Sequence, residues 1–135
     1  MKKLCVFDLD GTLTNTLENL AYVTNIALDT VGAEPCETEL FKYFAGDGAK
    51  MLIKRAMEYR KCDMSKLDQV FNTYMEHFKD DYCYLVKPYD GIKELVKELK
   101  EKGLKLAVYS NKPHAMAISV VEQVFGKGVF YYHWR

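Results

Sequence analysis

Two aspartates directly follow a short apolar run near the start of the chain. Asp8 and Asp10 come after residues 4–7, which read Leu-Cys-Val-Phe. If residues 4–7 form a strand, its period-two geometry aims both carboxylates the same way, while Leu9 between them points to the core. Two like charges at this spacing repel, and they are tolerated when a divalent cation lies between them. Mg²⁺ fits because it accepts one or two carboxylates together with phosphate oxygens.

The residues around this acidic pair suit phosphate chemistry. Gly11 permits a sharp turn and close backbone approach, and the Thr12 hydroxyl and loop N–H groups can hydrogen-bond a phosphate. With metal and phosphate bound, Asp8 can attack phosphorus and form an aspartyl-phosphate. Asp10 would then protonate the leaving oxygen and later activate water. A structural alternative stays open, because D-x-D-G sequences also cap turns after edge strands.

A second polar cluster ends the next predicted strand. Ser110 and Asn111 follow residues 104–109, which are largely apolar. Ligands of parallel sheets gather at the carboxyl ends of the strands, so we expect these side chains to share one crevice with Asp8 and Asp10. Taken alone, Ser110 is more typical of an ordinary helix N-cap. Its pairing with Asp8 favours a phosphate-binding role instead.

Apolar periodicity predicts the elements that must position these groups. Residues 4–7 are expected to form a buried strand. The next 70 or so residues show helical segments and no convincing strand, at residues 15–31, 37–44, 49–59 and 65–84. After the Pro-Tyr-Asp-Gly segment the chain alternates helix, strand, helix, strand, at residues 90–102, 104–109, 113–125 and 129–132. This order is typical of an α/β protein with a parallel sheet, interrupted by a helical block.

Polar and proline residues predict where several of these helices begin. Asn15 or Thr16 is expected to cap the first helix, and Ser65 to open the long helix before residue 84. Asp90 is expected to cap the charged helix that follows. Pro113 is expected as the first residue of the last helix.

Two of these segments resemble motifs of a known family. Residues 6–13, VFDLDGTL, resemble the first motif of the haloacid dehalogenase superfamily of phosphohydrolases, and residues 108–112, VYSNK, resemble its second. The resemblance implies a Rossmann-type parallel sheet with an inserted all-helical cap. It is strongest to phosphoglycolate phosphatase-like members, through residues 46–49, 88–91 and 110–113.

The resemblance also implies domains and residue roles. Residues 1–14 and 86–135 would form the α/β core and residues 15–85 the cap. Asp8 would be the nucleophile and Asp10 the general acid and base, with Mg²⁺ on the Asp8 carboxylate and the Asp10 carbonyl. Ser110 would hold the phosphoryl group. The further substrate-binding residues would be Gly11, Thr12 and Asn111.

The sequence departs from the family pattern after the second motif. The family's third motif is a lysine well beyond the second, and its fourth is an acidic pair beyond that. The sequence ends 25 residues after Ser110, and Lys127 comes too early to stand in. We therefore expect a truncated chain with an incomplete sheet, whose exposed edge invites self-association. Activity should be impaired, since loss of one electrostatic group costs about 10²- to 10³-fold.

Composition narrows the possible functions. The 135 residues, 49% of them apolar and 28% charged, exclude a large two-domain enzyme. Nineteen basic residues balance nineteen acidic ones, so nothing indicates a nucleic-acid partner. No apolar run approaches the roughly 20 residues of a membrane span. The cysteines lack metal-ligand spacing and are expected to be reduced thiols in a cytoplasmic protein, at positions Cys5, Cys36, Cys62 and Cys83.

These expectations favour one function over two alternatives. The favoured one is a Mg²⁺-dependent phosphatase whose partner is a small phosphorylated metabolite resembling phosphoglycolate. The alternatives are a phosphotransferase of the same superfamily, such as a sugar phosphomutase, and a non-catalytic phosphate-binding fragment. In the helical block, Lys50 and Arg55 either meet a substrate carboxylate or are ordinary solvated charges.

Overall fold

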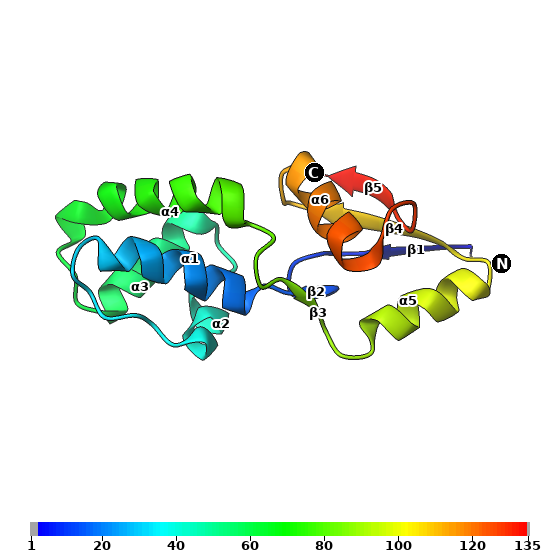
Figure 1. The fold of residues 1–135 in the computed structure, drawn as a ribbon, viewed down its shortest axis with the longest axis horizontal. Coiled ribbons are helices and arrows are strands. Elements are labelled where there is room, and N and C mark those ends of the chain that lie inside the picture. The colour runs from blue at the N-terminus through cyan, green and yellow to red at the C-terminus, as the bar shows by residue number, and fades with distance from the viewer. Residues whose placement is uncertain (1–2, 135) are drawn as a thin grey trace. The chain divides into compact units, whose positions relative to one another are not determined.

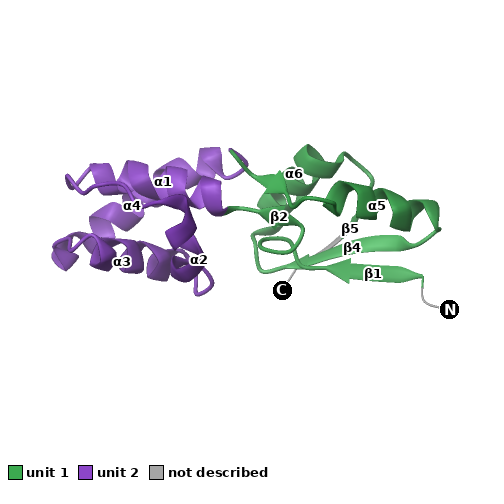
Figure 2. Cartoon of the chain, turned by 90° about the horizontal axis from the view of Figure 1, so that it is seen from below, with its two compact units in different colours: residues 1–16, 85–135 green, residues 17–84 purple. Residues whose placement is uncertain are grey.

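The computed structural model describes residues 3–134. The chain forms two compact units (Figure 2). The first comprises Met1–Thr16 and Leu85–Arg135, and the second comprises Leu17–Tyr84. The chain therefore leaves the first unit once and returns to it once.

A three-stranded parallel sheet organises the first unit. The strands β1 (Leu4–Phe7), β4 (Lys105–Ser110) and β5 (Tyr131–Trp134) lie in the order β1-β4-β5. Leu4 lies opposite Lys105, and Phe7 lies opposite Val108. The predicted α/β class with a small parallel sheet is confirmed.

Two helices cover one face of this sheet. The connections from β1 to β4 and from β4 to β5 cross the sheet in the same direction, and their helices, α5 (Ile92–Glu101) and α6 (His114–Phe125), lie on the same side (Figure 2). The buried residues of this layer are largely aliphatic, namely Val96, Leu106, Val108, Ala117, Val120 and Val121. Phe130 packs edge-on against Phe7 and Phe125, with ring centroids 6.4 and 5.3 Å away. These contacts hold the strands in register beneath the helices.

The opposite face of the sheet carries exposed apolar side chains. Strand alternation and the pairing register place Leu4, Val6, Tyr109 and Tyr131 on this face. Their exposed fractions are 53%, 57%, 40% and 57%. Parallel sheets are normally covered on both faces. In the described part of the chain this face has no helix over it, and β1 has a strand neighbour on one side only.

The second unit is a bundle of helices around its own core (Figure 1). Its helices are α1 (Leu17–Asp29), α2 (Phe41–Phe44), α3 (Ala49–Tyr59) and α4 (Leu67–Asp81), with short 3-10 turns at Thr38–Leu40 and Met64–Lys66. α1 and α4 run side by side, and Tyr74 of α4 is buried and stacks on Phe78 at 5.4 Å. This stack lies on the side of α4 that faces the core of the unit. No helix among residues 3–134 is both long and apolar enough to cross a bilayer.

Several predicted helix starts are wrong. Ser65 does not open the long helix, because a 3-10 turn comes first and the Asp63 carboxylate caps it by accepting the Ser65 N–H. Asp90 does not cap α5. The residue before that helix is Gly91, in the left-handed conformation, with no side-chain cap bond. Pro113 holds the N-cap position of α6, one residue earlier than predicted.

A two-residue ladder was not predicted. β2 (Thr14–Asn15) pairs antiparallel with β3 (Lys87–Pro88), and Thr14 lies opposite Pro88. Asn15 therefore lies in a strand and is not a helix cap, whereas Thr16, the other predicted cap, directly precedes α1. The ladder ties together the two chain segments that flank the helical unit.

Candidate active site

The loop after β1 folds around one carbonyl oxygen. Leu9 O accepts hydrogen bonds from the N–H groups of Thr12, Leu13 and Thr14, at 3.1, 3.0 and 3.1 Å. Gly11 takes a positive φ of 81°, and its N–H donates to Thr14 O at 2.8 Å. Because Leu9 and Leu13 are fully buried, the loop is anchored at two points. The anchored loop presents its acidic residues at the end of the strand.

The two carboxylates of this loop face solvent. Asp8 is exposed, and its Oδ1 accepts the Leu9 N–H at 2.8 Å. The Asp10 side chain is 41% exposed. Leu9 lies between them with no exposed surface, as the strand alternation predicts. The carboxylates can therefore meet a ligand at the strand end.

The backbone N–H groups of this loop are largely engaged with the loop itself. The Gly11 and Thr12 N–H groups donate to Thr14 O and Leu9 O. Thr12 is exposed. Its hydroxyl, rather than its N–H, is therefore the group of this residue that we expect to meet a phosphate.

Ser110 closes β4 and stabilises the turn that follows. Its side chain is buried, and its Oγ accepts the Lys112 N–H at 3.1 Å. Ser110 is not the N-cap of α6, since Pro113 holds that position and α6 begins at His114. A hydroxyl that accepts one hydrogen bond still has its own proton to donate. Asn111 is exposed beside it.

Lys112 joins the two strand ends, and the sequence analysis did not identify it as a site residue. Its Nζ lies 3.3 Å from Asp10 Oδ2. The Lys112 side chain is 9% exposed, whereas that of Asp10 is 41% exposed. Its place two residues beyond Ser110 puts it near the predicted site, but the contact with Asp10 does not follow from sequence spacing. The structure thus brings Asp10 to the β4 end, as the parallel-sheet argument expects.

The oxygen donors at the β1 end suit a hard cation. The Asp8 carboxylate and the Asp10 carbonyl offer oxygen ligands, and Mg²⁺ commonly takes one or two carboxylates and completes its shell with water and phosphate. Among the side chains that the structure describes, no group of three or more His, Cys, Asp or Glu gathers as a metal cage. The donor set therefore fits a cation shared with a phosphorylated ligand.

Lys50 and Arg55 of the helical unit are engaged in ion pairs. Lys50 Nζ lies 2.9 Å from Asp68 Oδ1, and Arg55 Nη2 lies 2.6 Å from Asp47 Oδ2. Arg55 Nη1 also donates to Phe44 O at 3.1 Å. Both cations thus stabilise their own unit, and a substrate carboxylate would have to compete with these partners.

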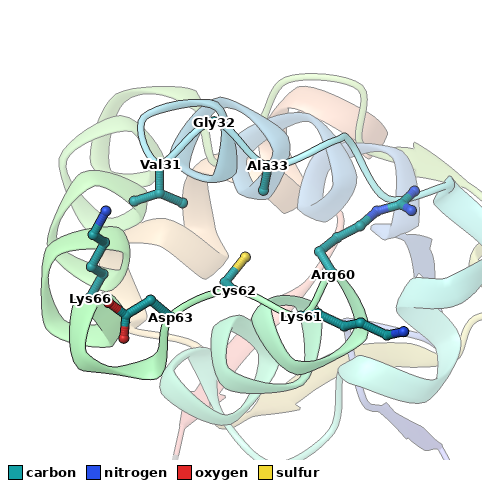
Figure 3. Close-up of a pocket in the computed structure, with 8 residues that line it drawn as sticks. All are labelled: Val31, Gly32, Ala33, Arg60, Lys61, Cys62, Asp63 and Lys66. Atoms are coloured by element: carbon teal, nitrogen blue, oxygen red, sulfur yellow. The ribbon is translucent and has the colours of Figure 1, made fainter.

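A cavity of about 250 Å³ lies within the helical unit (Figure 3). The Cys62 thiol points into it, whereas the Arg60 and Lys61 side chains extend away. Its lining comes from the turns after α1 and α3, namely Val31, Gly32, Ala33, Arg60, Lys61, Cys62, Asp63 and Lys66. None of the predicted site residues lines this cavity.

The fold and the strand-end residues define a class of protein. It is an α/β protein with a parallel sheet, an acidic first strand end and a helical unit inserted after that strand. The chain belongs to the haloacid dehalogenase-like hydrolase family, whose model matches residues 5–131. The family predicted from the two motifs is therefore confirmed.

Individual relatives agree with this assignment. The chain is 38% identical over 117 residues to the phosphoglycolate phosphatase of Haemophilus influenzae, covering 82% of this chain and 52% of that protein. The crystal structure of a predicted phosphoglycolate phosphatase from Haemophilus somnus matches 98% of this chain and 62% of its own, with 27% identity and a TM-score of 0.80. A predicted β-phosphoglucomutase from Thermotoga maritima shares the fold, with 22% identity over 99% of this chain and 61% of its own, at a TM-score of 0.70. The chain spans about half the length of the curated relatives it matches.

Proposed function

We propose that this chain carries the nucleophile half of a Mg²⁺-dependent phosphatase site that hydrolyses a small phosphomonoester. The observation that carries the proposal is the meeting of the two strand ends, where Lys112 Nζ lies 3.3 Å from Asp10 Oδ2. The parallel register supports it, because Asp8 and Ser110 follow paired residues of β1 and β4. Membership of a hydrolase family supports the same reaction class.

The proposed reaction has two steps on Asp8. The Asp8 carboxylate attacks phosphorus, the ester bond to the leaving oxygen breaks, and Asp10 gives that oxygen its proton. Asp10, now a carboxylate, then takes a proton from water. That water attacks the phosphorus of the aspartyl-phosphate, which releases inorganic phosphate and restores Asp8. The Ser110 hydroxyl donates to a phosphoryl oxygen while its own oxygen keeps the Lys112 turn in place.

Asp8 and the Asp10 carbonyl would hold Mg²⁺, which supplies positive charge to the phosphoryl oxygens when bound. Gly11, Thr12 and Asn111 would complete the contacts of the phosphoryl group. The exposure of Asp8 and of the loop residues leaves room for these ligands.

The substrate we propose is a small acidic phosphate such as phosphoglycolate, because the curated relatives at 38% and 29% identity are phosphoglycolate phosphatases. The helical unit Leu17–Tyr84 would act as the cap that selects it. A polypeptide of these 135 residues alone should turn over slowly, because the match covers only about half the length of the phosphoglycolate phosphatases. We place the protein in the cytoplasm, a location that its thiol-containing core supports.

The uncovered sheet face supports a further proposal about assembly. Leu4 and Val6 on edge strand β1 are 53% and 57% exposed, and exposed apolar strand edges promote pairing with another chain. We infer that copies of this chain self-associate through this face.

A phosphatase assay tests the proposed reaction. Purified protein is incubated with phosphoglycolate and Mg²⁺, and phosphate release is measured beside Asp8→Asn and the control Asp29→Asn. We expect release that requires Mg²⁺, is abolished in Asp8→Asn and is unchanged in Asp29→Asn. Isomerisation of a sugar phosphate without hydrolysis would favour a phosphomutase instead. Phosphate binding with no turnover and no covalent phosphate on Asp8 would identify a non-catalytic fragment.

A further inference from the structure

We propose that Lys112 is a positioning residue that fixes the Asp10 carboxylate, so that the β4–α6 connection as well as β1 sets the geometry of the acid and base. This inference rests on the proposed function. Its first observation is the contact of Lys112 Nζ with Asp10 Oδ2, at 3.3 Å.

The path of the backbone explains why Lys112 reaches Asp10. Ser110 is buried at the end of β4, and its Oγ accepts the Lys112 N–H at 3.1 Å. This hydrogen bond closes a tight turn two residues long. The turn fixes where the Lys112 side chain leaves the main chain. Ser110 therefore fixes the backbone position from which the Lys112 side chain extends. The Lys112 ammonium in turn holds the Asp10 carboxylate at the end of β1.

The burial of the two partners shows which one is held and which one can react. Only 9% of the Lys112 side chain is exposed, so the protein packed around it restricts where its ammonium can lie. Asp10 keeps 41% of its side chain exposed, so a ligand can reach it. A side chain that is largely covered thus anchors a carboxylate that stays accessible. A pair of two exposed side chains would hold neither in place.

The same contact separates the roles of the two aspartates. Lys112 engages the side-chain oxygen of Asp10, whereas the donors expected for Mg²⁺ are the Asp8 carboxylate and the Asp10 carbonyl. The ammonium thereby fixes where the Asp10 carboxylate lies at the end of β1. It also places a positive charge where the ends of β1 and β4 meet.

A spectroscopic experiment tests the contact without requiring turnover. Lysine ammonium signals are recorded by ¹H–¹⁵N correlation in the full chain, and Lys112→Met assigns the signal of Lys112. We expect that signal to exchange slowly with water, to shift in Asp10→Asn and to stay in place in Asp29→Asn. A Lys112 signal that exchanges like those of exposed lysines, or that ignores Asp10→Asn, would overturn the inference.

A kinetic experiment then separates positioning from simple support of the fold. Lys112→Met should lower kcat by about tenfold to a hundredfold, part of the usual contribution of a general acid and base, with little change in KM. Lys112→Arg should recover most of that loss, and Lys127→Met should match the unaltered chain. Equal kcat in Lys112→Met and the unaltered chain would reject the role. If the unaltered chain has no turnover, the proposed function fails, while the ammonium spectrum still decides whether Lys112 holds Asp10.

Discussion

Phe7 of β1 lies opposite Val108 of β4 in the parallel sheet. Asp8 follows Phe7 directly, and Ser110 follows Val108 by two residues. Both residues therefore lie at the carboxyl-terminal ends of their strands, on the same end of the sheet. A pairing made mainly by apolar strand residues thereby brings Asp8, the proposed nucleophile, and Ser110, the proposed phosphate-binding hydroxyl, to the same end of the sheet.

The hydroxyl of Ser110 should therefore be needed for turnover. We expect Ser110→Ala to lower kcat/KM by about 10²-fold, because it removes a donor to the phosphoryl group and loosens the turn that leads to Lys112. Ser110→Thr keeps the hydroxyl and serves as the matched control. Steady-state hydrolysis of phosphoglycolate measures both variants. An unchanged kcat/KM in Ser110→Ala would contradict the role of this side chain.

Gly11 offers a test of backbone strain in the acidic loop. Its φ is +81°, and a Cβ built there meets no heavy atom within 4 Å. Gly11→Ala should therefore cost about 1–2 kcal/mol of unfolding free energy through strain alone. Urea unfolding measures the loss, with the neighbouring exposed position Thr12→Ala as the control. Equal stability of the two variants would mean that the loop relaxes when glycine is replaced.

Burial should make Cys36 a poor nucleophile. Burial is the largest influence on the Cys36 thiol and raises its pKa above 9.0, although Arg60 beside it acts in the opposite direction. The raised pKa keeps the thiol neutral in the folded chain. Its contribution to stability is therefore complete below pH 9.0 and is lost as the pH rises through the raised value.

Alkylation with iodoacetamide at pH 8, followed by mass spectrometry, checks this prediction. Cys36 should react more slowly than the half-buried Cys62 in the folded chain, and both should react alike after denaturation. Faster labelling of Cys36 than of Cys62 in the folded chain would show that the thiolate is favoured there.

Local patterns in the sequence were sufficient to predict the first strand of the site and part of the helical unit. The apolar run that precedes Asp8 correctly predicts the bounds of β1, and helical periodicity correctly predicts those of α3. The expected burial of the strand is wrong, because one face of the sheet is uncovered and leaves Leu4 and Val6 exposed. Both signals depend only on neighbours along the chain. The family also follows from such a local signal, because its two motifs are short and continuous.

The features that sequence reasoning missed depend on distant or competing contacts. Lys112 meets Asp10 across 102 positions, and neither residue type nor spacing predicts that contact. The β2–β3 ladder has two residues in each strand, too few for any periodicity. The prediction that Ser65 opens the long helix is wrong because the Asp63 carboxylate, two residues earlier, accepts the Ser65 N–H and caps a 3-10 turn that comes first. In each case the structure is determined by a contact with a residue distant in the sequence or by a competing neighbour in the sequence.

The open sheet face leads to a prediction about assembly. Val6 is 57% exposed on edge strand β1, so Val6→Lys removes apolar surface there without creating a core defect. A lysine on an edge strand also opposes pairing with another strand. Sedimentation velocity should show concentration-dependent association of the unaltered chain and a monomer for Val6→Lys. The matched control is Tyr43→Lys in the helical unit, whose position is 75% exposed and should leave association intact. Association that survives Val6→Lys but disappears in Tyr43→Lys would place the contact on the helical unit instead of the sheet.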